Sequence, residues 1–186
     1  GSGDDSYSVD NVSDVVTEDA NAGTDVVSSS VSYLLPINVE NLTLTGTAAL
    51  NGTGNGLANV MVGNAANNQL NGGSGADTLI GGRGNDSYII DNANDMVTER
   101  LNEGIDIVSS SVTYTLSANV ENLTLIGTTA INANGNGLAN NLKGNTAANR
   151  LTGGGGNDTL DGGTGKNILT GGTGKDIFKL TTTGHI

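Results

Sequence analysis

The sequence predicts an all-β chain in which very short parallel strands stack into a solenoid. Two internal repeats support this prediction, one of nine residues and one of 81 residues. No window longer than about 11 residues shows the periodicity of an amphipathic helix. Composition agrees, because the 186 residues include 30 glycines and only 3% aromatics, which leaves few large side chains for a deep core.

The nine-residue repeat has the pattern G-G-x-G-x-D-x-U-x, in which U is a large apolar residue. It occurs at 72–80, 81–89, 153–161, 162–170 and 171–179, with softer copies at 54–62 and 63–71. The glycines allow a tight turn over the first six residues, and the last three residues favour a strand. Such a unit buries nothing until it stacks on copies of itself. The central strand residues should form an inward row: Leu70, Leu79, Tyr88, Leu160, Leu169 and Phe178.

The 81-residue repeat is a tandem duplication, with about 50 of 81 positions identical. We expect one continuous solenoid fragment over 1–186, with a first copy at 1–81, a second at 82–162 and the start of a third at 163–186. Two nonapeptides make one coil, so an unbroken lattice would place equivalent turns on opposite edges of the stack. Wider coils elsewhere would return them to one edge, and the sequence leaves both arrangements open.

Two segments, Asp25–Leu50 and Asp106–Ile131, lack the glycine turns and are rich in Val, Ser, Thr and Leu. Their alternating apolar residues indicate half-buried strands. We expect wider β-rungs of the same stack between the repeat blocks. A small separate β insert is the alternative.

The charge and the residue types exclude several functions. Nineteen acidic and seven basic residues give a net charge of −12, which disfavours nucleic acid as a partner. No apolar run approaches the roughly 18 residues of a membrane span. The absence of Cys excludes disulfides and thiolate metal sites. The charge indicates that cations are the partners.

The aspartate at the sixth position of each nonapeptide gives the turn a carboxylate among exposed carbonyls. Ca²⁺ binds six to eight oxygens of both kinds. Aspartates 18 residues apart should stack about 5 Å apart, Asp77 over Asp95 and Asp158 over Asp176. Two carboxylates at that distance repel by about 3 kcal/mol at an effective dielectric constant of 20, and a shared cation reverses the sign.

The nonapeptides at 72–89 and 153–179 resemble the RTX (repeats-in-toxin, hemolysin-type) calcium-binding family of exported bacterial proteins. The resemblance implies a right-handed parallel β-roll, or β-helix solenoid, with several Ca²⁺ ions lodged between successive turns. It also implies type I secretion and folding outside the cell or at its surface.

The resemblance further implies which residues bind calcium. The sixth-position carboxylates are Asp77, Asp86, Asp158 and Asp176, with Asp5 in a truncated repeat. Further candidates just past the good repeats are Asp10, Asp14, Asp25, Asp91, Asp95 and Asp106, which Glu18 and Glu99 would join. The turn and carbonyl positions are Gly72, Gly73, Gly75, Gly81, Gly82, Gly84, Gly153, Gly154, Gly156, Gly162, Gly163, Gly165, Gly171, Gly172 and Gly174.

Amide side chains replace the aspartate in several turns. Asn167 should weaken any site that depends on it. Four other asparagines are expected to stabilise turns rather than bind metal: Asn59, Asn68, Asn140 and Asn149.

The expected function is a non-catalytic calcium-binding module of a larger secreted bacterial protein, which folds on binding extracellular Ca²⁺. The alternative is a module that binds a polysaccharide or a cell surface, as in alginate-modifying enzymes or surface-layer proteins. Its candidate contacts are Arg83, Arg100, Lys143, Arg150, Lys166, Lys175 and Lys179. We expect no enzyme activity, because Glu40 and Glu121 are isolated carboxylates and the only histidine, His185, lies near the end of the chain.

Overall fold

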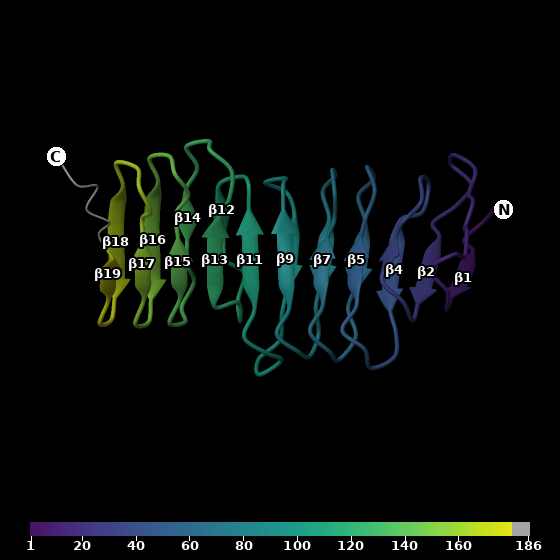
Figure 1. Cartoon of the computed structure of the whole chain (residues 1–186), viewed down its shortest axis with the longest axis horizontal. Helices are drawn as coiled ribbons and strands as arrows, with labels where there is room; N and C mark the ends of the chain where they lie inside the picture. Colours follow the sequence, from purple (N-terminus) through teal and green to yellow (C-terminus); the bar gives the residue numbers. More distant parts are fainter. Residues whose placement is uncertain (180–186) are drawn as a thin grey trace. The chain divides into compact units, whose positions relative to one another are not determined.

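A computed structural model describes residues 1–179, so His185 lies outside the described residues. Within this range every regular element is a β-strand, and there is no helix long and apolar enough to cross a membrane. The chain divides into two compact units, Gly1–Gly104 and a second that begins at Ile105. Each is described separately below, and the labels are those of Figure 1.

The first unit contains two parallel sheets, and the chain alternates between them from β2 onward. One sheet follows the order β1 (Ser6–Val9), β2 (Val26–Ser29), β4 (Asn41–Leu44), β6 (Val60–Val62), β8 (Thr78–Ile80) and β10 (Met96–Thr98). The facing strands are β3 (Tyr33–Leu34), β5 (Asn51–Thr53), β7 (Gln69–Asn71) and β9 (Ser87–Ile90). Alternation between two parallel sheets makes this unit a β-solenoid.

The second unit repeats this arrangement. One row of parallel strands contains β11 (Ile107–Ser110), β13 (Asn122–Leu125), β15 (Asn141–Lys143), β17 (Thr159–Asp161) and β19 (Ile177–Lys179). The other contains β12 (Tyr114–Thr115), β14 (Ala133–Asn134), β16 (Arg150–Gly155) and β18 (Ile168–Thr173). The all-β, parallel solenoid class predicted from the sequence is therefore confirmed in both units.

The core of each unit consists of buried apolar side chains that stack from strand to strand in the parallel register. In the first unit the strand register places Leu42 over Met61 and Met61 over Leu79, and all three are fully buried. Leu70 and Tyr88 are also fully buried, in the facing sheet. The small apolar area of each coil is therefore buried by its neighbours.

The predicted inward row is confirmed at four of its six positions, the fourth being Leu160 in the second unit. It is wrong for the last two, since Leu169 is only half-buried and Phe178 is exposed. Their register is as expected, over Leu151 and Leu160, but β18 and β19 are the last described strands of their sheets. No later described strand covers them.

In each unit the segment without glycine turns supplies strands to the same sheets as the glycine-turn strands, so it is not a separate insert. Paired residues give the coil lengths: Ser6 to Val26 is 20 residues, Val26 to Asn41 is 15, Asn41 to Val60 is 19 and Val60 to Thr78 is 18. The expectation of uniformly wider rungs is therefore wrong, because one rung is shorter than a nonapeptide coil. The same 15-residue and 19-residue steps recur in β11, β13 and β15.

The coil lengths also decide, within the first unit, whether equivalent turns of the two copies lie on one edge of the stack or on opposite edges. Strands β1 and β9 occupy equivalent positions of the 81-residue repeat, yet they lie in opposite sheets. The longer and shorter coils cancel, so 81 residues still amount to four and a half coils. The continuity of all copies in one solenoid stays a prediction.

Candidate metal centre

An acidic or amide residue directly precedes each strand of the six-stranded sheet, and these residues form what we call the strand-start ladder. Its members in the first unit are Asp5, Asp25, Glu40, Asn59, Asp77 and Asp95. A backbone N–H of one member donates to the side-chain oxygen of the next, as from Asn59 to Asp77 Oδ1 (2.8 Å) and from Asp77 to Asp95 Oδ1 (3.1 Å). The N–H groups of Asp5 and Asp25 donate in the same way to Asp25 Oδ1 and Glu40 Oε2, both at 2.8 Å.

The second unit has its own strand-start ladder, whose members are Asp106, Glu121, Asn140, Asp158 and Asp176. The N–H of Asp106 donates to Glu121 Oε2, that of Asn140 to Asp158 Oδ1 and that of Asp158 to Asp176 Oδ1, at 2.8 to 3.1 Å. The predicted stacking of Asp77 with Asp95 and of Asp158 with Asp176 is confirmed.

The ladder also includes two residues that sequence reasoning treated only as isolated carboxylates, Glu40 and Glu121. Each accepts the N–H of the aspartate one coil earlier. The signal was available in the sequence, because each glutamate directly precedes the Asn-Leu-Thr-Leu strand just as the aspartates precede theirs.

One oxygen of several ladder carboxylates remains without a hydrogen bond. Asp77 and Asp158 are 1% and 0% exposed, and Oδ2 of each is buried without a partner among the described residues. Burial raises the pKa of Asp77 to about 6; the Asn59 N–H partly opposes this, and the charges of Asp95 and Asp91 add to it. Burial likewise raises the pKa of Asp158. A buried anionic oxygen with no donor fits a bound cation.

The asparagines of the softer repeats use both ends of their amides, as expected for turn-stabilising residues. Asn59 Oδ1 accepts the N–H of Asn55 at 2.8 Å, and its Nδ2 donates to the carbonyl of Glu40 at 3.1 Å. Asn140 makes the same contacts, while Asn68 and Asn149 donate to the carbonyls of Leu50 and Ile131. The Nδ2–H groups of these asparagines therefore donate hydrogen bonds to carbonyl oxygens that would otherwise be free to bind a cation.

The glycines of the repeats are required because each turn sits closely on the previous one. A Cβ on Gly73 would lie 2.6 Å from the carbonyl oxygen of Asn55, and one on Gly75 would overlap that of Leu57. Both residues also have positive φ, +78° and +149°. Most of the predicted turn glycines lie between strands, but the prediction is wrong for Gly153, Gly154, Gly171 and Gly172. These four lie within β16 and β18, because the parallel pairing of the two strands continues past their apolar residues, through Gly154 with Gly172. The carbonyl oxygens of Asn55 and Leu57 lie against the turn of the next coil. Carboxylates and carbonyls between turns are the donor set that Ca²⁺ prefers.

The turns differ in what they stack on. The turns at 72–77 and 81–86 precede β8 and β9, which lie in different sheets, so they do not stack on each other. Only 153–158 and 171–176, which precede the paired strands β17 and β19, bring two complete G-G-x-G-x-D turns together. Residues 162–167 carry Asn167, whose Oδ1 accepts the Asn149 N–H.

The other sequence-predicted ligands occupy several environments. Asp86 is buried, and its Oδ1 accepts the Asn68 N–H at 2.6 Å. Asp14 and Asp95 each use Oδ2 to accept backbone N–H groups of their own turns. Asp10, Asp14 and Asp91 are exposed, whereas Asp106 is buried at the start of β11. That all these residues bind calcium stays a prediction.

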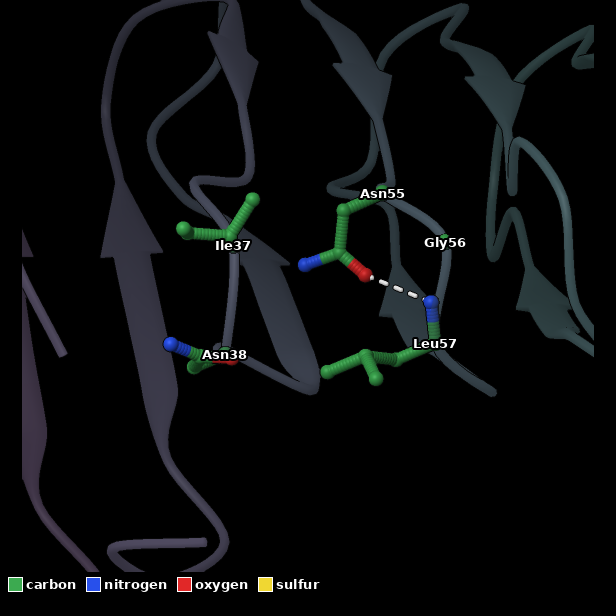
Figure 2. A pocket seen from close by; sticks show the side chains of 5 residues that line it. All are labelled: Ile37, Asn38, Asn55, Gly56 and Leu57. Carbon is green, nitrogen blue, oxygen red and sulfur yellow. Dashed lines mark hydrogen bonds between the residues drawn. The ribbon is translucent and has the colours of Figure 1, made fainter. Parts of the chain in front are cut away.

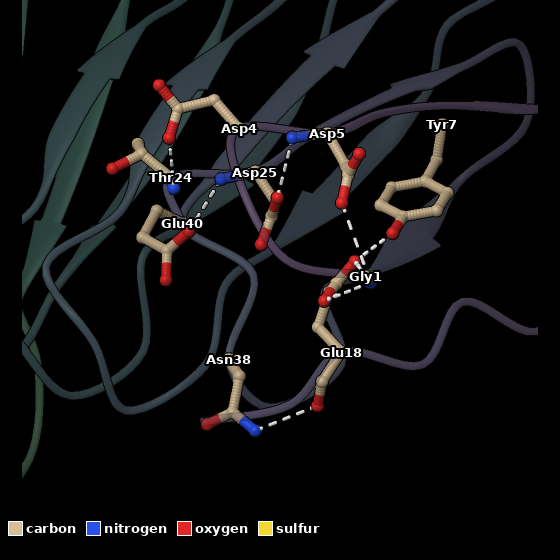
Figure 3. Close-up of polar contacts among 9 residues, drawn as sticks. All are labelled: Gly1, Asp4, Asp5, Tyr7, Glu18, Thr24, Asp25, Asn38 and Glu40. Carbon is tan, nitrogen blue, oxygen red and sulfur yellow. Dashed lines mark hydrogen bonds and ion pairs between the residues drawn. The ribbon is translucent and has the colours of Figure 1, made fainter. Parts of the chain in front are cut away.

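Three of the candidates, Asp5, Glu18 and Asp25, come together in the first unit (Figure 3). One carboxylate oxygen of each lies within 4.8 Å of the others. Tyr7 donates its hydroxyl to Glu18, and Tyr88 donates its hydroxyl to Glu99 in the second copy of the repeat. This grouping depends on the fold, because its members lie 13 and seven residues apart in the sequence.

A separate pocket lies beside the turn at 54–59 (Figure 2). Its lining residues are Ile37, Asn38, Asn55, Gly56 and Leu57. None of them is basic or aromatic, so the pocket lacks the contacts expected of a polysaccharide groove.

Oxygen-rich glycine turns between parallel coils place the chain in the class of calcium-binding β-solenoids. Residues 53–88, 134–169 and 143–178 match the family model described as RTX calcium-binding nonapeptide repeat (4 copies). The chain therefore carries RTX calcium-binding nonapeptide repeats, and Ca²⁺ is its cofactor. Searches of curated proteins and of solved structures find no significant match.

Proposed function

We propose that this calcium-binding module is non-catalytic and belongs to a larger secreted bacterial protein, in which it folds on meeting extracellular Ca²⁺. The observation that supports this most directly is the buried Oδ2 of Asp77 and of Asp158, which has no donor among the described residues. Each such oxygen opposes the metal-free fold, since a buried charge without a partner is costly. Calcium removes this cost only where its concentration is high, outside the cell.

The composition supports calcium-dependent folding as well. A net charge of −12 and 30 glycines both favour the unfolded chain in the absence of counter-ions. A ligand that binds only the folded state shifts the folding equilibrium toward that state by mass action. The module would then remain unfolded through export and fold afterwards, and it would act as a stable spacer in its parent protein.

The non-catalytic role is supported by the hydrogen bonds that the two isolated carboxylates make. Glu40 and Glu121 accept backbone N–H groups within the ladders. A polysaccharide-binding or surface-binding role remains the alternative proposal, to be tested by retention of the calcium-loaded chain on immobilised alginate.

Circular dichroism during a calcium titration tests the proposal. In EDTA the chain should be mostly disordered, and β-sheet signal should return cooperatively as Ca²⁺ is added. Mg²⁺ at the same concentration is the control, and it should restore much less signal because it requires a stricter octahedral site. A metal-free chain that is fully folded and equally heat-stable would contradict calcium-dependent folding.

A further inference from the structure

Four turns carry an asparagine at both their second and their sixth position, and we call them the amide turns. Two lie in the first unit, at 54–59 and 63–68, and two in the second, at 135–140 and 144–149. The G-G-x-G-x-D segments have glycine at the second position, whereas each amide turn has a side chain there. These second-position residues are Asn55, Asn64, Asn136 and Asn145.

The second-position asparagine ties each amide turn to the coil before it. Asn55 Nδ2 lies 2.7 Å from the carbonyl oxygen of Pro36 and 2.7 Å from that of Val39, so one amide nitrogen donates to both. Its Oδ1 accepts the N–H of Leu57 at 2.9 Å, which fixes the orientation of the amide (Figure 2). One uncharged group thus holds two carbonyl oxygens together, as a bound cation would.

The same amide bridge occurs in the other three amide turns. In each, Oδ1 accepts the N–H two residues further on, at 2.8 to 2.9 Å. The Nδ2 contacts, at 2.7 to 3.4 Å, join Asn64 to the carbonyls of Thr45 and Ala48, Asn136 to those of Ser117 and Val120, and Asn145 to those of Ile126 and Thr129. The bridge is therefore a regular feature of these turns in both units.

The backbone of the amide turns also differs from that of the G-G-x-G-x-D segments. The structure describes all four amide turns, and none of their residues has positive φ. By contrast, Gly73 and Gly75 have φ of +78° and +149°, and Gly154 and Gly156 have φ of +104° and +98°. Glycine at such positions loses more conformational entropy on folding than other residues do. The amide turns are therefore less costly to close than the glycine-rich ones, before any ion binds.

In each unit a G-G-x-G-x-D segment stacks directly on an amide turn. In the second unit a Cβ on Gly154 or Gly156 would overlap the carbonyl oxygens of Asn136 and Leu138, as on the equivalent glycines of the first unit. Glycine has no side chain with which to bridge these oxygens, so the calcium of the nonapeptide repeats takes the place that the amide holds one coil earlier. Each amide turn is thus held by amide groups on one side and offers carbonyl oxygens to calcium on the other.

We propose that the amide turns are calcium-independent locks that hold residues 36–71 and 117–152 together without metal. These locked segments contain β4 to β7 in the first unit and β13 to β15 in the second. When calcium is added, the G-G-x-G-x-D segments close on the locked segments, which act as a template. This inference rests on the proposed function, because that function makes the remaining segments depend on calcium. The β-structure that persists in EDTA should then lie in the locked segments.

Hydrogen–deuterium exchange of the whole chain in EDTA, followed by mass spectrometry of its peptides, tests the locks. We expect residues 36–71 and 117–152 to exchange about tenfold more slowly than residues 72–98 and 153–179. In saturating CaCl₂ all four segments should be protected. Equally fast exchange of the two kinds of segment in EDTA would overturn the locks. Slow exchange of the whole chain in EDTA would instead overturn the calcium-dependent function.

Asn136→Ala tests the bridge itself, because it removes both amide donors. Exchange of residues 117–152 in EDTA should become about tenfold faster, with unchanged Ca²⁺ stoichiometry in isothermal titration calorimetry. Asn141→Ala is the matched control and should change neither measurement, since Asn141 is an exposed asparagine directly after the same turn. Asn136→Asp should lose the protection in EDTA and regain it in CaCl₂, because a carboxylate that faces two carbonyl oxygens requires a cation. Fewer bound ions in Asn136→Ala, or unaltered exchange in EDTA, would contradict a calcium-independent lock.

Discussion

The strand-start ladders predict that Asp158→Asn has opposite effects with and without calcium. Neighbouring ladder carboxylates are one strand spacing apart, about 4.8 Å, at which two unit charges repel by about 3 kcal/mol at an effective dielectric constant of 20. Asp158 is fully buried, its pKa is raised by burial, and Asp176 is its ladder neighbour. Asparagine removes the charge but keeps the oxygen that accepts the Asn140 N–H.

The new amide should also donate to the preceding coil, as Asn68 and Asn149 do. We therefore expect the metal-free Asp158→Asn chain to be more stable than the parent by roughly 1 to 3 kcal/mol. For a chain of this size, that corresponds to a rise in Tm of about 2–4 °C for each kcal/mol. In calcium the same variant should melt below the parent, because a ligand of the most complete pair of turns is lost.

Because the parent chain is expected to be mostly disordered in EDTA, the metal-free effect is measured as the β-sheet circular dichroism signal in EDTA, and the calcium effect as the Tm in saturating CaCl₂. The reverse substitution Asn140→Asp is the matched control, since it adds a charge to the same ladder and should lower the β-sheet signal in EDTA. If Asp158→Asn shows no more β-sheet signal than the parent in EDTA, charge repulsion within the ladder does not oppose the metal-free fold and the electrostatic reasoning is refuted.

Two further predictions concern the turns and the pH. Gly75→Ala should disrupt folding even in calcium, because its Cβ would overlap a carbonyl oxygen of the preceding turn. Gly56→Ala is the control and should fold normally, because no atom lies near its added Cβ. Equal calcium-dependent circular dichroism of the two variants would refute the steric argument. The raised pKa of Asp77, about 6 against 3.8, means that the metal-free fold binds a proton that the unfolded chain has released between about pH 4 and 6. The free energy of unfolding of the metal-free chain should therefore fall as the pH rises through this window. Calcium affinity should fall by up to about tenfold per pH unit as the pH is lowered below 6. A free energy of unfolding that rises with pH would contradict the raised pKa of Asp77.

Much of the fold was predictable because the nine-residue repeat constrains every level of structure at once. The glycines allow the turn, the three residues after it can only form a strand, and 18-residue stacking follows from two such strands per coil. Leu79 and Tyr88 were correctly placed in the core, and the stacking of Asp158 with Asp176 was confirmed. These features depend on local conformation and on a constant period, both of which can be read along the chain.

The segments without the period were harder to predict, because their coil lengths depend on which strands pair. The 15-residue step from Val26 to Asn41 shortened a rung that was expected to be wider. Glu40 entered the ladder because its long side chain reaches the Asp25 N–H from the next coil. The coil length has no signature in residue spacing alone, whereas the place of Glu40 directly before its strand does.

The sequence by itself determined the parallel solenoid, the glycine turns and the need for cations, since each follows from residue type and period. Only the tertiary structure decided which turns face each other and which segments become strands. Met96–Thr98 forms β10, which pairs with β8, whereas the equivalent residues 15–17 of the first copy form no strand. A three-residue strand cannot hold its conformation alone, so its existence depends on the hydrogen bonds that an adjacent coil supplies.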